Sequence, residues 1–201
     1  MTDTATTPSF LENLRSTTAQ SHTALEALPI SASIMDPNVT NEDYSLYLDL
    51  MHDVVKDAEE NIFPALKDII TDLDERNKSH LLHKDLEKLG VTTKSNTQKP
   101  MSASLENTSK AFALGIMYVV EGSSLGGRVI LKNINAALGH DIETGASYFG
   151  GYAGQTGSYW KNFLGMLTQY EAANNNADEI IAGADYAFKA ISRHFTDNAS
   201  R

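Results

Sequence analysis

The chain has 201 residues, a formal net charge of -10 and no cysteine. Disulfides, thiolate metal ligands and cysteine nucleophiles are therefore excluded. The acidic balance argues against nucleic-acid binding and against binding to an anionic membrane, because both need a basic face. The N-terminal sequence MTDTATTPS lacks the basic and apolar segments of a signal peptide. No stretch approaches the roughly 18 consecutive apolar residues of a membrane span, so we expect a cytoplasmic protein.

The N-terminal half predicts four helices after a flexible arm over residues 1–9. The helices are expected over residues 10–28, 41–62, 65–73 and 76–89. Thr40 or Asn41 is a suitable cap for the second helix. Pro29 is expected to stop the first helix and Pro64 to break the chain after the second, because proline disrupts a helix interior. Gly90 is a typical C-terminal stop for the fourth helix.

The C-terminal half predicts three ordered segments and one long irregular connection. Residues 104–138 read as helix or strand, residues 139–157 as a glycine-rich connection, and residues 177–195 as the last helix. The helix before it is expected to begin at Thr156 or Ser158. Convincing alternating strands are absent from the pattern. We therefore expect an all-α protein with one domain over residues 10–197 and a short tail over 198–201.

The stretch YVVEGSSLGGRVI at 118–130 contains Gly122, Gly126 and Gly127 between apolar flanks. One interpretation is a strand, a phosphate-binding glycine loop and a helix. The Walker and GxGxxG patterns are missing, and no βαβ neighbours surround the stretch, which weighs against that interpretation. The other interpretation is a long helix that bends at its glycines. Its stripped face would accept either a flat ligand or a closely packed second helix.

His22 lies on or beside the apolar stripe of the first predicted helix. A histidine satisfied inside the core is the commoner explanation of such a position. However, Glu26 is four residues on and shares the same face, where a carboxylate fixes the imidazole tautomer and supports metal ligation. Arg15 lies two turns earlier on that face. One histidine without thiolates cannot build a protein-only metal cage, but it suits haem, which brings four ligands of its own.

Three motifs together resemble the haem oxygenases, and most closely the bacterial branch linked to iron acquisition or to bacteriophytochromes. They are LRxxTxxxHxxLE at 14–26, YVVEGSSLGGRVI at 118–130 and GYxxxTGxxWxxF at 151–163. The resemblance spans roughly residues 10–195. It implies an all-α helical bundle in which haem lies between a proximal N-terminal helix and a kinked, glycine-rich distal helix.

The resemblance also implies roles on the proximal side. His22 matches the family's iron ligand, and Glu26 matches the acid that orients it. Arg15 falls where the family places a basic residue near the haem propionates, and Lys161 is a second candidate for that role. Phe188 is a candidate for the pocket wall.

On the distal side, the resemblance assigns Gly122, Gly126 and Gly127 to the backbone that lies over the haem. Tyr118 is a further candidate for the pocket wall. Animal-type members carry an aspartate directly after the first distal glycine, where it organises water near bound oxygen. Ser123 occupies that position here. Bacterial relatives also lack the aspartate. The residues that would deliver protons are therefore unassigned.

The implied activity is oxidative cleavage of haem to biliverdin with release of CO and ferrous iron. It would use O2 and electrons from a ferredoxin or a flavoprotein reductase, with haem as both substrate and prosthetic group. A haem carrier of the same fold without turnover is an alternative. A di-iron oxidase is another, since Glu59, Glu60 and Glu121 are available, although the matching histidines are missing. A purely structural helical protein is the remaining alternative.

Overall fold

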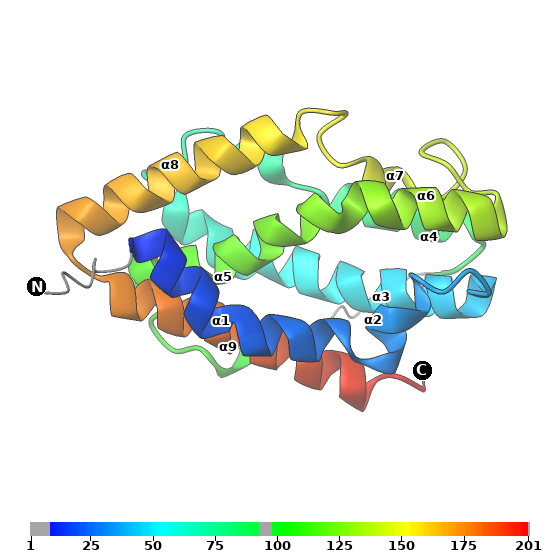
Figure 1. Cartoon of the computed structure of the whole chain (residues 1–201), viewed down its shortest axis with the longest axis horizontal. Helices are drawn as coiled ribbons and strands as arrows, with labels where there is room; N and C mark the ends of the chain where they lie inside the picture. The colour runs from blue at the N-terminus through cyan, green and yellow to red at the C-terminus, as the bar shows by residue number, and fades with distance from the viewer. Residues whose placement is uncertain (1–8, 93–97, 201) are drawn as a thin grey trace, which may run out of the picture.

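The computed structural model describes residues 9–92 and 98–200, and within these residues it contains helices and turns but no strand. The expected all-α fold is confirmed. The α-helices are α1 (Phe10–Glu26), α2 (Pro29–Ser33), α3 (Asn41–Asp57), α4 (Ser79–Lys88), α5 (Lys110–Gly122), α6 (Gly127–Leu138), α7 (Ser147–Gly150), α8 (Thr156–Asn174) and α9 (Ala177–Asp197). Figure 1 shows α5 and α6 along the middle of the molecule, α8 above them, and α1 and α9 below. Most of the predicted N-terminal arm, residues 1–8, lies outside the described residues.

Side-chain caps define where α1 and α3 begin. Ser9 and Glu12 form a reciprocal capping box at the start of α1, and Thr40 and Asp43 do the same at the start of α3. The first helix ends at Glu26 rather than near residue 28. Pro29 does not simply stop a helix but stands at the start of α2, where its missing N–H has no intrahelical partner to lose.

The helices expected over 65–73 and from residue 76 are corrected by the structure. A π-helical turn over Ala58–Ile62 and 3-10 turns over Phe63–Leu66 and Leu73–Arg76 follow α3, and α4 begins only at Ser79. The apolar spacing that suggested a helix is real, since Leu66, Ile70 and Leu73 are buried. Because successive tight turns can bury the same residues, the spacing did not distinguish them from one regular helix.

The central α5 packs against α9 through two glycines. A Cβ atom on Gly115 would lie 2.0 Å from the Ile180 carbonyl oxygen, and one on Gly183 would lie 2.1 Å from the Phe112 carbonyl oxygen. No side chain fits at either position, so the two backbones come together at van der Waals distance. On its other side α9 contacts α1, and Ser21 donates a 2.7 Å hydrogen bond to Asp185 there.

Of the segment expected over 104–138, Lys110–Leu138 is helical rather than a strand, and its regular geometry changes at the glycines. The helix begins six residues later than expected, at the Ser109 cap. A 3-10 turn over Ser123–Gly126 joins α5 to α6. The Ser123 and Ser124 hydroxyls donate to the carbonyl oxygens of Val120 at 2.7 Å and Glu121 at 2.6 Å. These bonds span three residues, as a 3-10 turn does, and they explain why the bend falls here.

The stretch Lys110–Leu138 is long and apolar enough to cross a membrane by length and composition. Half of its most apolar window is buried inside the protein. Most of its apolar side chains belong to, or pack against, the core cluster that also contains residues of α3 and α9. Packing within the fold therefore accounts for much of the apolar composition.

A buried charged cluster anchors the end of α5. The Arg76 guanidinium, which is fully buried, donates to Glu121 at 2.6 Å and to Asp72 at 2.7 and 2.8 Å. Lys78 and Tyr152 also reach the Glu121 carboxylate, at 2.8 Å and 2.7 Å. Burial tends to raise the pKa of Asp72, but hydrogen bonds and charge from Arg76 outweigh it, so that pKa is lowered. The cluster fixes Glu121 directly before Gly122.

Candidate functional site

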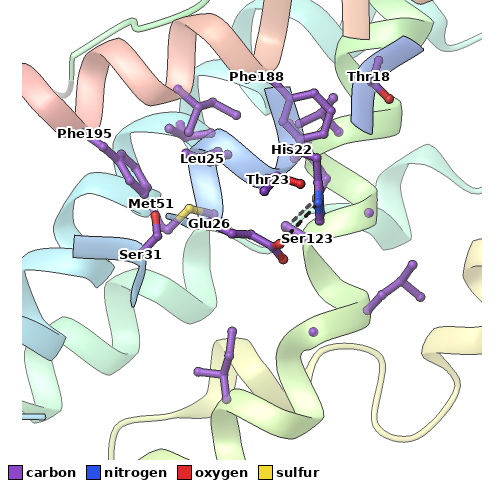
Figure 2. A pocket seen from close by; sticks show the side chains of 18 of the residues that line it. Thr18, His22, Thr23, Leu25, Glu26, Ser31, Met51, Ser123, Phe188 and Phe195 are labelled. Carbon is purple, nitrogen blue, oxygen red and sulfur yellow. Dashed lines mark hydrogen bonds and ion pairs between the residues drawn. The ribbon is translucent and has the colours of Figure 1, made fainter. Parts of the chain in front are cut away.

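A cavity of about 1020 Å³ lies between α1 and the α5–α6 segment, with further walls from α2, α3 and α9. Figure 2 shows it from close by, with α1 side chains on one side and the 3-10 turn on the other. Apart from a few polar groups, the lining is aliphatic and aromatic. A cavity of this size and character suits one large and mainly apolar ligand.

One wall carries His22 and Glu26 of α1. The His22 Nδ1 atom lies 3.4 Å from the Glu26 carboxylate, and the ring meets Phe188 of α9 edge-on at 5.5 Å between centroids. The His22 side chain is 55% exposed, so it is not a histidine satisfied inside the core. Because Nδ1 faces Glu26, Nε2 is the ring nitrogen available to a ligand. This wall holds an oriented imidazole with an accessible nitrogen.

The opposite wall is bare backbone at Gly122 and Gly126, and both line the cavity. A Cβ atom on Gly122 would come no closer than 3.6 Å to Trp160, and one on Gly126 would lie 3.9 Å from Ile130. Protein packing therefore does not require either glycine. Ser123 lines the same wall.

Gly127 behaves differently from the two glycines before it. It is buried and does not line the cavity, and a Cβ atom there would lie 2.9 Å from the Phe149 carbonyl oxygen. Close approach to α7 explains this glycine. The two interpretations of the glycine stretch thus apply to different residues, with open space at Gly122 and Gly126 and tight packing at Gly127.

Arg15 and Tyr118 stand together on the lining. Burial raises the pKa of the Tyr118 hydroxyl, while the nearby Arg15 guanidinium opposes that rise. The Tyr118 ring also contacts Trp160 at 5.4 Å between centroids. Arg15 therefore gives this part of the cavity a cation suited to an anionic substituent. Lys161 is exposed and does not line the cavity. Its neighbour Trp160 is the residue of that helical turn that lines it.

Among the apolar side chains of the lining that sequence reasoning missed, three are large and exposed. Met35, Leu125 and Val129 are 44%, 48% and 57% exposed, which is unusual for large apolar residues. Leu125 and Val129 are three and seven residues after Gly122, so the helical face that places the glycines could have identified them. Met35 lies in the turn after α2, and no periodic pattern points to it.

The sequence model of the Heme oxygenase family matches residues 8–197. The chain belongs to the haem oxygenase family. No curated protein gives a significant match.

Solved haem oxygenases share the fold of this family member. The NO- and CO-bound enzyme from Neisseria meningitidis is similar with a TM-score of 0.78 and 24% identity, over 94% of this chain and 91% of that one. The haem oxygenase from Leptospira interrogans gives 0.74 and 19%, over 94% and 100%. Haem oxygenase-1 from the cyanobacterium Synechocystis, solved in complex with haem, gives 0.69 and 17%, over 94% and 92%.

The residues of this haem oxygenase family site fit a haem group. Within residues 9–92 and 98–200, no group of three or more His, Asp or Glu side chains could hold a metal ion. Glu59 accepts hydrogen bonds from the Lys78 and Ser79 backbone, and Glu121 is bound by Arg76 and Lys78. These carboxylates are therefore not available as di-iron ligands. One accessible imidazole in an apolar cavity suits a ligand that brings its own metal.

Proposed function

We propose that this protein is a haem oxygenase that cleaves haem to biliverdin and releases CO and ferrous iron. The observation that carries the proposal is the pairing, across one apolar cavity, of an exposed His22–Glu26 couple with bare backbone at Gly122 and Gly126. Membership of the haem oxygenase family supports it. When bound, haem would supply both the iron that activates O2 and the porphyrin ring that is opened.

On the α1 wall, His22 would ligate the iron through Nε2. The Glu26 carboxylate favours the tautomer with a proton on Nδ1, which leaves Nε2 with its lone pair. Phe188 packs against the imidazole edge and limits its rotation. A neutral histidine donates less electron density than a thiolate, and the thiolate is the ligand that favours O–O cleavage.

On the opposite wall, the glycine backbone leaves room above the ligand. Side chains at Gly122 and Gly126 would project into that room, because both positions line the cavity without a close protein neighbour. Leu125 and Val129 would cover the apolar parts of the ring and exclude water. Arg15 would pair with a propionate, and this contact would set how the ring is rotated in its plane and which bridging carbon meets the oxygen.

External electrons complete the proposal, and a ferredoxin or a flavoprotein reductase is the expected donor. The excess of acidic over basic residues is consistent with a cytoplasmic protein that binds neither nucleic acid nor a membrane.

Titration with hemin, followed by addition of ascorbate in air, tests the proposal. The wild type should give a histidine-type Soret band that bleaches while a bile-pigment band grows. His22→Ala should lose the histidine-type complex and the turnover. The matched control is His80→Ala, because His80 is exposed on α4 and does not line the cavity. A wild-type Soret band that survives reductant would identify a haem carrier, and normal turnover by His22→Ala would overturn the ligand assignment.

A further inference from the structure

The wall opposite His22 presents a single kind of polar side chain. From Val119 to Ile130, the residues that line the cavity are glycines and aliphatic residues, with Ser123 as the exception. Ser123 is exposed to the cavity at the bend between α5 and α6. Its hydroxyl is therefore the side-chain group that this stretch of wall can offer to a polar ligand opposite His22.

The Ser123 hydroxyl has a buried partner, Tyr148 of α7. The two hydroxyl oxygens lie 3.3 Å apart, and Ser123 donates its own proton to the Val120 carbonyl oxygen at 2.7 Å. Tyr148 is consequently the donor between the two hydroxyls. Burial raises the pKa of Tyr148 to about 12. The hydrogen bond with Ser123 opposes this rise, and the charges of Glu121 and Glu59 add smaller contributions to it. The phenol therefore keeps its proton at neutral pH and remains a donor.

The position of Tyr148 is fixed by Asp85 of α4, which is buried. Its carboxylate accepts hydrogen bonds from the Ser147 N–H at 2.8 Å, the Ser147 hydroxyl at 2.7 Å and the Tyr148 N–H at 2.8 Å. These three bonds hold the start of α7 against α4. Tyr148 is only 6% exposed, so its hydroxyl stays behind the wall. The pair is thus assembled before any ligand enters.

We propose that Ser123 and Tyr148 together form the hydrogen-bond donor that the cavity presents to a small ligand bound opposite His22. This inference rests on the proposed function. Rotation about the Ser123 Cβ–Oγ bond turns its proton from Val120 toward the cavity, while Tyr148 continues to donate to the same oxygen. A hydroxyl that accepts one hydrogen bond is a stronger donor in the next. Ser123 is then the group that touches the ligand, and Tyr148 is a positioning residue that acts through it.

Ser124 offers a matched control. Its hydroxyl also bonds a carbonyl oxygen three residues back, that of Glu121 at 2.6 Å. Unlike Ser123, it does not line the cavity. Ser123→Ala and Ser124→Ala each remove the same kind of bond from the 3-10 turn. They differ in that only Ser123→Ala also removes a hydroxyl that faces the cavity.

Fluoride binding to the ferric hemin complex tests the pair, because fluoride accepts hydrogen bonds and cannot donate one. Ser123→Ala should raise the fluoride Kd by about tenfold, the loss of roughly one hydrogen bond to an anion. Tyr148→Phe should raise it by about two- to threefold, through a weaker Ser123 donor. Ser124→Ala should leave the fluoride Kd unchanged. Ser123→Thr keeps the hydroxyl and should have a fluoride Kd close to the wild-type value. The Kd is read from the optical spectrum and needs no turnover.

The outcomes separate this inference from the proposed function. Equal fluoride Kd values for Ser123→Ala, Ser124→Ala and wild type would overturn the donor pair while the hemin complex stands. An unaltered Kd in Tyr148→Phe would overturn the positioning role of Tyr148. A wild type that forms no hemin complex would overturn the proposed function and this inference together. The expected fluoride differences in a complex that does not turn over would support the pair and point to a carrier.

Discussion

The imidazole of His22 is oriented in part by a neighbour four residues along the same helix. Glu26 lies 3.4 Å from Nδ1, and both side chains are more than half exposed. In a cavity filled by an apolar ligand, water would leave this pair and their interaction would strengthen, because the local dielectric constant falls. The His22–Glu26 interaction is weak in the open cavity, and it would become strong enough to stabilise a bond between His22 and the ligand.

Glu26→Gln should weaken hemin binding by about tenfold, since partners of a metal-bound histidine contribute on this scale. The glutamine keeps the size of the side chain and removes its charge. The hemin dissociation rate, followed at the Soret band with a trapping apoprotein, measures the effect. Glu143→Gln, at an exposed position outside the cavity, is the control. Equal dissociation rates in wild type and Glu26→Gln would contradict the assigned role of Glu26.

The sequence was most informative where a role depends on spacing within one helix. His22, Glu26 and Arg15 share a helical face, and all three line the cavity. Lys161 was a poorer candidate because its place depends on how α8 is rotated about its axis, and Trp160 takes the inward position there. The rotation of a helix about its axis is set by packing across the whole bundle. The spacing of residues within one helix carries no information about that packing.

At the scale of elements, the α5–α6 segment shows that neighbouring glycines can serve opposite needs. Gly126 and Gly127 are adjacent and both have right-handed helical backbone angles. The first faces open space and the second faces the backbone of α7. Their sequence context could not separate them, because the difference comes from Phe149, more than twenty residues later in the chain. The predicted bend itself followed from the local Gly and Ser content.

Gly126→Ala and Gly127→Ala should therefore have opposite effects. At Gly126 alanine has room, and it should leave the free energy of unfolding of the hemin-free protein unchanged or raise it by up to about 1 kcal/mol. It should weaken hemin binding, because the methyl group projects into the cavity. At Gly127 the methyl group would meet a carbonyl oxygen and lower the free energy of unfolding by about 1–3 kcal/mol.

Urea denaturation and hemin titration of both variants measure these effects. Gly127→Ala should lower the free energy of unfolding already in the hemin-free protein. If Gly126→Ala destabilised the hemin-free protein as much as Gly127→Ala does, the assignment of open space at Gly126 would be wrong.

At the scale of the whole molecule, a buried charged cluster connects three separate parts of the chain. Arg76 and Lys78 precede α4, Glu121 lies in the last turn of α5, and Tyr152 belongs to the connection before α8. Local sequence patterns do not predict this cluster, because its members are far apart in the chain and charged residues are usually exposed.

Arg76→Met should lower the free energy of unfolding by about 3–5 kcal/mol, because it removes the buried cation that Glu121 and Asp72 share and leaves only Lys78 on Glu121. Methionine keeps the length of the side chain, so the loss reports charge and hydrogen bonding rather than volume. Arg193→Met, at an exposed position on α9, should change the stability by far less. Urea denaturation of both variants makes the comparison, and equal losses would show that the cluster contributes no special stability.

The contact between α1 and α9 has a consequence for synthesis of the protein. These helices stand at opposite ends of the chain, yet Ser21 bonds Asp185 and His22 packs on Phe188. On the ribosome, the N-terminal wall of the cavity would emerge long before the helix that supports it. The cavity can close only when translation has reached the last helix. A ligand that contacts both His22 and Phe188 would therefore meet its complete site only on the finished chain.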